Sequence, residues 1–99
     1  MRRGLRVNRP PASRRRVIVH GQVQGVGFRI ACARRAAEAQ LRGWVRNLPD
    51  GTVEAVFEGE SSAVERLTSW SADGPPMARV TRVEVFDEPL VGEVGFSVR

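Results

Sequence analysis

Residues 43–59 read "GWVRNLPDGTVEAVFEG", and this stretch decides which fold the rest of the sequence predicts. Two strand-like runs flank Pro49-Asp50-Gly51, and an Asp-Gly pair between such runs is typical of a β-hairpin. In the second run, residues 53–58, apolar side chains alternate with glutamates. This alternation predicts one buried face and one partly wet face.

The segments on either side of the hairpin each add a strand and a helix. Residues 17–19 form a β-branched run typical of a central strand, and the apolar spacing over residues 28–40 favours a helix. After the hairpin, Ser62 and Glu65 form a capping-box pattern at the start of a helix that we expect to end near residues 73–76. Residues 78–88 alternate as a strand, and residues 92–99 can add a short last strand. The order predicts an α+β, ferredoxin-like βαββαβ sandwich whose antiparallel sheet carries both helices on one face.

Length and hydropathy indicate one small domain that does not span a membrane. The chain has 99 residues, and no apolar run approaches the roughly 18 residues that a membrane span needs. The first 16 residues lack the apolar core and cleavage site of a signal peptide. We therefore expect a cytoplasmic protein, and a monomer as the default for so short a chain.

The net charge of +5 is concentrated at the start of the chain. Residues 1–16 hold seven arginines and no acid, so the remainder has nine arginines against eleven acids and a charge of about −2. Few apolar groups accompany these arginines, which predicts a disordered basic extension over residues 1–14 and a folded domain over residues 15–99. The domain itself is therefore not expected to bind nucleic acid.

One cysteine and one histidine exclude an internal disulfide and a tetrahedral zinc site made of these residue types. No metal and no cofactor are predicted. Cys32 lies on the apolar stripe of the first helix and is interpreted as a small buried hydrophobe. His20 is likewise interpreted as structural.

A glycine-rich loop precedes the first helix, in residues 20–29, "HGQVQGVGFR". Between a strand and a helix, backbone N–H groups and the helix dipole can together bind an anion, and Gly25 and Gly27 permit the positive φ angles this requires. Arg29 adds a planar fork that can hold two phosphate oxygens. The loop lacks the Gly-Lys-Ser/Thr of a Walker A motif and the third glycine of a dinucleotide fingerprint. The residues alone leave two alternatives open: an oxyanion site, or a tight turn between strand and helix.

Residues 21–29, "GQVQGVGFR", followed by residues 43–59, resemble the signature pair of the acylphosphatase family. "GPPMARVTRVEV" and "GFSVR" also fit the later strands of that family, so the resemblance covers about residues 15–99. It implies hydrolysis of the carboxyl–phosphate bond of acyl phosphates to a carboxylate and inorganic phosphate. By the same resemblance, Arg29 binds phosphate and Asn47 positions the attacking water. The implied phosphate-binding residues are Gln24, Gly25, Val26, Gly27, Phe28 and Arg29.

Two rival interpretations remain. The same element order builds RNA-recognition domains, which stack bases on aromatic residues of their central strands, but here the first strand has none and the third has only Phe57. The other rival is an acylphosphatase-like domain within a larger carbamoyl-transfer protein. Because the chain stops at Arg99, we expect an autonomous enzyme instead.

Overall fold

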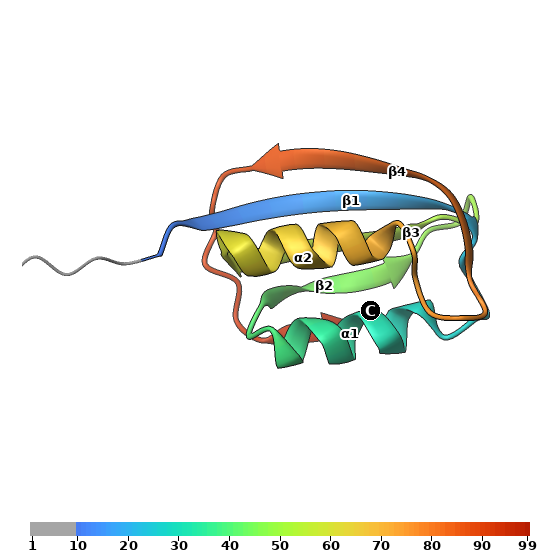
Figure 1. Cartoon of the computed structure of the whole chain (residues 1–99), viewed down its shortest axis with the longest axis horizontal. Coiled ribbons are helices and arrows are strands. Elements are labelled where there is room, and N and C mark those ends of the chain that lie inside the picture. Colours follow the sequence, from blue (N-terminus) through green and yellow to red (C-terminus); the bar gives the residue numbers. More distant parts are fainter. Residues whose placement is uncertain (1–9) are drawn as a thin grey trace, which may run out of the picture.

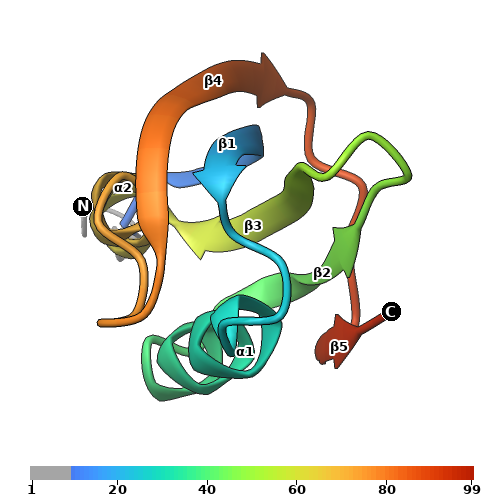
Figure 2. The same ribbon diagram turned by 90° about the vertical axis from the view of Figure 1, so that its right-hand side faces the viewer.

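The computed structural model describes residues 10–99, in which two helices cover one face of a five-stranded sheet (Figures 1 and 2). The elements in chain order are β1 (Ala12–Gln22), α1 (Phe28–Glu38), β2 (Arg42–Asn47), β3 (Val53–Glu60), α2 (Ser61–Ser71), β4 (Arg79–Glu88) and β5 (Phe96–Val98). The strands lie in the order β4-β1-β3-β2-β5. The predicted α+β ferredoxin-like sandwich is confirmed.

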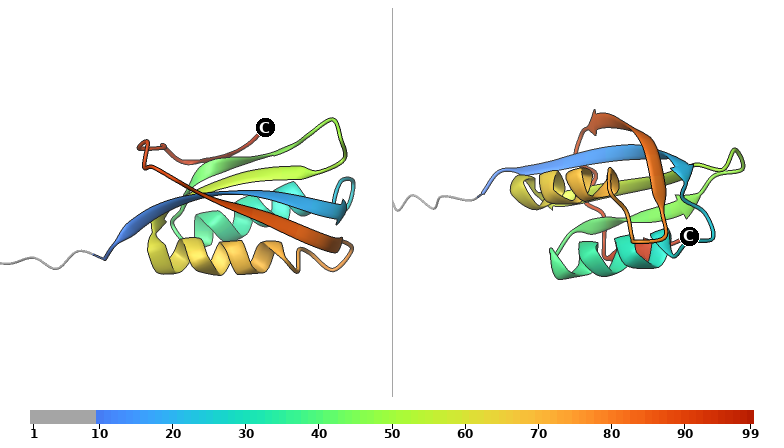
Figure 3. Two further views of the ribbon diagram at one scale, coloured as in Figure 1. Left: turned by 90° about the horizontal axis from the view of Figure 1, so that it is seen from above. Right: turned by 45° about the vertical axis from the view of Figure 1, so that its right-hand side comes forward.

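The strand pairing is antiparallel between β1, β2, β3 and β4, as predicted, but β5 pairs with β2 in parallel. The sheet is therefore mixed, and the expectation of a wholly antiparallel sheet is wrong at this one edge. The reason is topological: the connection after β4 crosses the end of the sheet before β5 begins, so β5 runs in the same direction as β2 (Figure 3).

The core lies between the sheet and the two helices. Val17 and Val19 of β1 and Ala55 and Phe57 of β3 face Cys32, Leu67 and other apolar residues of the helices. Phe57 is thus buried under the helices, and does not lie on the open face of the sheet where a base could stack.

The helix boundaries differ slightly from the sequence prediction. α1 ends at Glu38, and Gln40 then takes a positive φ of 57°, which ends the helix two residues before the predicted boundary. The capping box is not formed, because α2 begins at Ser61 and no side chain caps it; instead Ser62 Oγ donates to Glu60 Oε1 at 3.0 Å.

The first strand begins at Ala12, three residues before the expected start of the domain. Residues 1–9 of the predicted disordered extension lie outside the described residues. Residues 12–14 belong to β1, and Arg14 is buried. Arg14, Arg15 and Arg16 therefore belong to the folded sheet, and each pairs with carboxylates of other strands.

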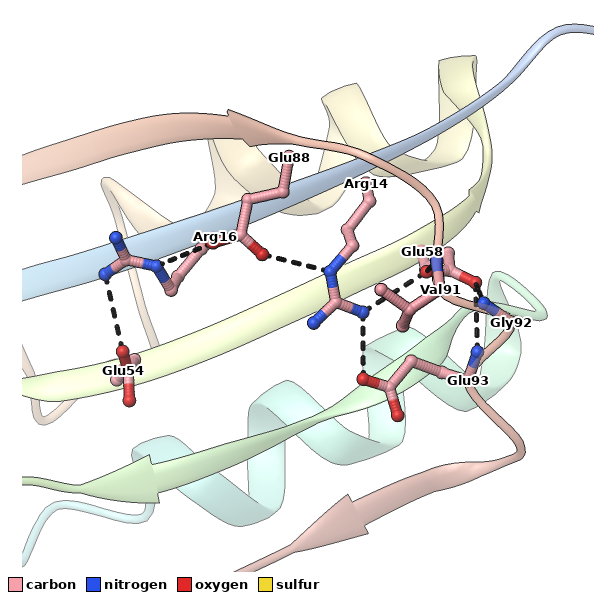
Figure 4. A network of polar contacts seen from close by, with 8 residues as sticks. All are labelled: Arg14, Arg16, Glu54, Glu58, Glu88, Val91, Gly92 and Glu93. Atoms are coloured by element: carbon pink, nitrogen blue, oxygen red, sulfur yellow. Dashed lines mark hydrogen bonds and ion pairs between the residues drawn. The ribbon is translucent and has the colours of Figure 1, made fainter.

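The expected wet face of β3 is also wrong, because Glu54 and Glu58 are only 7% and 1% exposed. Arg16 and Arg46 pair with Glu54 at 3.4 and 2.7 Å. Arg14 Nη1 donates to Glu58 Oε1 at 3.2 Å (Figure 4). Arginines of neighbouring strands thus cover the glutamates that the alternation had assigned to solvent.

Glu58 also receives three backbone hydrogen bonds from the segment that leads to β5. The N–H of Val91 donates to Oε1 at 3.0 Å, and those of Gly92 and Glu93 donate to Oε2 at 2.8 and 3.0 Å (Figure 4). Burial by itself raises the pKa of Glu58, but these N–H groups and Arg14 outweigh it and hold the pKa below its ordinary value. We call Glu58, Arg14 and the N–H groups of residues 91–93 the Glu58 anchor.

Candidate active site

A small cavity of about 90 Å³ opens where β1 runs into α1, beside the end of β2. Its lining brings together the two parts of the chain that the sequence singled out, the glycine-rich loop and the hairpin. The lining residues are Val23, Gly25, Gly27, Phe28, Arg29, Ile30 and Asn47.

The loop backbone is held in a conformation that only glycine adopts easily. Gly25 and Gly27 have φ angles of 74° and 80°, and Gly27 is the residue that immediately precedes α1. A Cβ added at either glycine would have open space around it, so backbone conformation and not crowding requires glycine here. No side chain caps α1 and its first turn contains no acid, so its first N–H groups are free to bind an anion.

Gln24 joins the loop to the hairpin, and its side chain lies outside the cavity lining. Its Nε2 donates to the backbone oxygens of Leu48 and Thr52 at 2.8 and 2.9 Å. In the turn itself, Thr52 Oγ1 and N–H both donate to Asp50 Oδ1, and these bonds lower the pKa of that carboxyl. The predicted turn at Asp50-Gly51 is confirmed, and Gln24 fixes it against the loop.

Arg29 lines the cavity from the first turn of α1. Its Nη1 donates to the backbone oxygen of Arg99 at 3.0 Å. No aspartate or glutamate side chain among residues 10–99 forms an ion pair with Arg29.

Asn47 lines the same cavity from the last position of β2, where the hairpin turn begins. Its Oδ1 is the one buried side-chain oxygen or nitrogen in residues 10–99 that has no hydrogen-bond partner. A buried acceptor without a partner costs free energy, and such atoms occur where a ligand or water completes the bonding. The neighbouring Arg46 pairs with Glu54 on the other face of the strand, as the alternation of side chains predicts.

Of the residues predicted to bind phosphate, four line the cavity and two do not. Gly25, Gly27, Phe28 and Arg29 do so, whereas Val26 packs against the core and Gln24 contacts the hairpin. Val23 and Ile30 also line the cavity and were missed. Ile30 is 58% exposed, and it lies off the apolar stripe of α1, whose buried residues are Phe28, Cys32 and Ala36. An apolar residue off that stripe is the signal in the sequence that could have found it.

The other candidate residues lie outside this lining. Cys32 is fully buried, and burial raises the pKa of its thiol to about 12, which agrees with a structural role. His20 lies beside Arg82 and Glu84, at 3.2 and 3.4 Å, on the open side of the sheet. Within residues 10–99, no three histidine, cysteine or acidic side chains come together as a metal site would require.

Comparison with known proteins identifies the family. A family model described as acylphosphatase matches residues 15–98. An acylphosphatase of Thermococcus kodakarensis is 58% identical over 80 residues, which cover 81% of this chain and 88% of that relative.

Solved structures agree with the sequence comparison. An acylphosphatase from Coxiella burnetii superposes with a TM-score of 0.85 at 41% identity, over 89% of this chain and 93% of that chain. An acylphosphatase from Bacillus subtilis gives a TM-score of 0.84 at 38% identity, over 88% and 98% of the two chains. This chain therefore belongs to the acylphosphatase family of enzymes, as residues 21–29 and 43–59 predicted.

Proposed function

We propose that this protein hydrolyses acyl phosphates to a carboxylate and inorganic phosphate, by in-line attack of a water molecule and without a metal ion. The observation that carries the proposal is the buried, unpartnered Oδ1 of Asn47 in the same cavity as Arg29 and the glycine loop. One wall of the cavity offers positive charge and N–H donors, and the other offers an acceptor. A phosphoryl group and an attacking water need these two kinds of partner.

The phosphoryl group binds between the loop and Arg29. Phosphoryl transfer depends on positioning and on stabilising the charge of the equatorial oxygens, which backbone N–H groups and a guanidinium can supply. Gly25, Gly27 and Phe28 carry the backbone that faces the cavity, and Arg29 provides the charged fork. Gln24 and Val26 support this surface, since their side chains hold the loop to the hairpin and to the core.

Asn47 positions the water. Its Oδ1 accepts a hydrogen bond from the water, and its side-chain NH₂ group can donate a hydrogen bond to a phosphate oxygen. Together these contacts place the water opposite the leaving group. The water oxygen forms a bond to phosphorus as the bond between phosphorus and the acyl oxygen breaks, and that electron pair leaves on the carboxylate. A phosphate oxygen takes the proton of the water.

No general acid is required in this scheme. The conjugate acid of a carboxylate leaving group has a pKa of roughly 4–5, so the group leaves without receiving a proton. This fits a cavity in which no lining residue is a histidine, an acid or a cysteine.

The cavity admits the phosphoryl end of the substrate only. Its volume of about 90 Å³ is small beside the roughly 300–1,000 Å³ of sites that enclose drug-sized ligands. The acyl group therefore lies at the mouth of the cavity, where Ile30 presents an exposed apolar side chain. The physiological acyl group is not specified by these residues.

The test is hydrolysis of benzoyl phosphate by the purified protein in EDTA, compared with a phosphate monoester. We expect turnover of the acyl phosphate alone, and its loss in Arg29→Ala. Arg34→Ala is the matched control, because Arg34 lies on the same helix, exposed and outside the cavity lining. Absence of turnover in a folded protein that still binds phosphate would show that the loop binds without catalysing.

We further propose that the protein acts as a cytoplasmic monomer and that its domain does not bind nucleic acid. Within residues 10–99 no helix is long and apolar enough to cross a membrane. Filter binding to mixed RNA, with the full chain and with a chain lacking residues 1–9, separates an effect of the basic extension from one of the sheet. The deletion stops before Arg14 because that residue holds the Glu58 anchor together.

A further inference from the structure

We propose that the Glu58 anchor fixes the position of Arg29 through β5, which makes Glu58 a positioning residue for phosphate binding. Glu58 lies at the opposite end of the sheet from the glycine loop (Figures 1 and 4). The proposal rests on the proposed role of Arg29 in holding phosphate. Each link between the two residues is a contact in the structure.

The connection between β4 and β5 crosses the whole width of the sheet. These strands form the two edges of the sheet and lie four strand spacings apart, or about 19 Å. The eight steps from Glu88 to Phe96 can span at most about 28 Å when fully extended. Residues 91–93 lie in the middle of this connection, and only two residues separate them from β5.

The strand β5 is short and lies at an edge of the sheet. It comprises three residues, and within residues 10–99 it pairs with β2 alone and packs against α1. Phe96 stacks on Phe57 at 6.0 Å between ring centroids, but Val94 is 95% exposed and Val98 is 41% exposed. The polar contacts of the Glu58 anchor add to these contacts by holding residues 91–93, which precede β5.

The anchor holds the connection at two points. Arg14 donates to Glu88 Oε1 at 3.0 Å, where the connection begins, and to Glu93 Oε2 at 2.8 Å, beyond its middle. Glu58 binds the N–H groups between these points with both carboxylate oxygens. Beyond them, the N–H of Gly43 donates to the backbone oxygen of Gly95 at 2.9 Å.

The far end of β5 meets Arg29. The N–H of Arg99 donates to Val45 O at 2.8 Å, and the Arg99 guanidinium lies 4.6 Å from the centre of the Trp44 ring. The backbone oxygen of Arg99 accepts the 3.0 Å hydrogen bond from Arg29 Nη1. A shift or loosening of β5 would thus move the acceptor that orients the Arg29 guanidinium.

Glu54 is a matched control for Glu58. Both lie on β3 with side chains on the open face of the sheet, both are nearly buried, and both pair with arginines. Only Glu58 contacts the segment that leads to β5. In Glu58→Gln, the side chain keeps its shape, but an NH₂ group replaces one carboxylate oxygen. Each of those oxygens accepts hydrogen bonds from two donors, and an NH₂ group cannot accept them.

The experiment compares Glu58→Gln with Glu54→Gln in the full chain, and uses inorganic phosphate as the probe. Amide hydrogen exchange at Gly43 and Arg99 reports on β5, and exchange in the β1–β3 ladder reports on the rest of the sheet. In Glu58→Gln we expect faster exchange at Gly43 and Arg99 than in the ladder. The phosphate dissociation constant should rise between about twofold and thirtyfold. Glu54→Gln should leave both quantities near those of the parent protein.

Two results would overturn the proposal. One is an unchanged phosphate dissociation constant in Glu58→Gln, and the other is an equal loss in both variants. If Glu58→Gln does not fold, Glu93→Ala removes the contact with Arg14 and leaves Glu58 intact; no change there in exchange or phosphate binding also overturns the proposal. Arg29→Ala separates the two proposals, since phosphate binding that survives in that variant contradicts the role of Arg29 itself.

Discussion

Replacing Asn47 with alanine should remove catalysis without destabilising the protein. The Oδ1 of Asn47 has no hydrogen-bond partner among the side chains and backbone of residues 10–99. Truncation therefore breaks no hydrogen bond of this oxygen within the described part of the protein. The space it leaves joins the existing cavity instead of forming a closed void. We therefore expect the free energy of unfolding to stay within about 1 kcal/mol of the parent value.

In the same variant, turnover should fall steeply while phosphate binding is retained. A single group that positions a reactant or stabilises a transition state contributes roughly 10²–10³ to kcat. Inorganic phosphate should inhibit Asn47→Ala about as well as the parent, because Arg29 and the loop remain. Thermal unfolding is a sensitive check, since about 1 kcal/mol shifts Tm by roughly 4–8 °C in a domain of this size.

Arg46→Ala is the matched control, because Arg46 is the adjacent residue and its side chain pairs with Glu54 on the other face of β2. It should keep its turnover and lose some stability. A marked fall in the Tm of Asn47→Ala with kcat near the parent value would contradict this prediction, since it would make Asn47 a structural residue. A large rise in the phosphate inhibition constant would also count against a role confined to water.

Three further outcomes are expected. Arg29→Lys should lose most activity in a benzoyl phosphate assay, because an ammonium cannot form a two-pronged contact with phosphate, and near-normal kinetics would contradict this. Activity in EDTA should equal that without chelator, and activity restored only by added metal would overturn the proposed mechanism. Hydrogen bonds from Arg14 and Arg16 lower the pKa of Glu88, and the pKa of Glu58 is lowered as described above. The two carboxylates thus stabilise the protein fully above their ordinary pKa of 4.5, and this stabilisation is lost as pH falls through their lower pKa values in the folded state. The free energy of unfolding measured with urea should therefore decrease below about pH 4.5, and it should decrease less steeply in Glu88→Gln.

The hairpin and the glycine loop could be predicted because their signals are local. Asp50-Gly51 specifies a turn, and Gly25 and Gly27 specify positive φ angles, whatever the rest of the chain does. The role of Asn47 could not be read from such signals. An asparagine near a turn is ordinary, and only the family resemblance, and then the unpartnered Oδ1, distinguished it.

Arg14 was assigned to the extension for a similar reason, and the ion pairs of Arg14, Arg15 and Arg16 were not foreseen. A run of arginines next to prolines has the composition of a solvated extension, and nothing nearby in the sequence shows that Glu58, Glu88 and Glu93 come to meet it. Those partners lie 44 to 79 positions away in the chain. Charge complementarity at that range is a property of the sheet register and is not visible before the register is known.

Both ends of the sheet present backbone N–H groups to the position of an anion, but only one end has an anion from the chain itself. At residues 91–93, consecutive backbone N–H groups converge on an anion that the chain itself provides, the Glu58 carboxylate. At residues 25–29, a glycine loop and an uncapped helix start face a cavity into which the chain places no carboxylate. An anion supplied from within makes the first site a structural joint. In the proposed function the second site receives its anion from the substrate, and the same arrangement of donors then serves as a binding site.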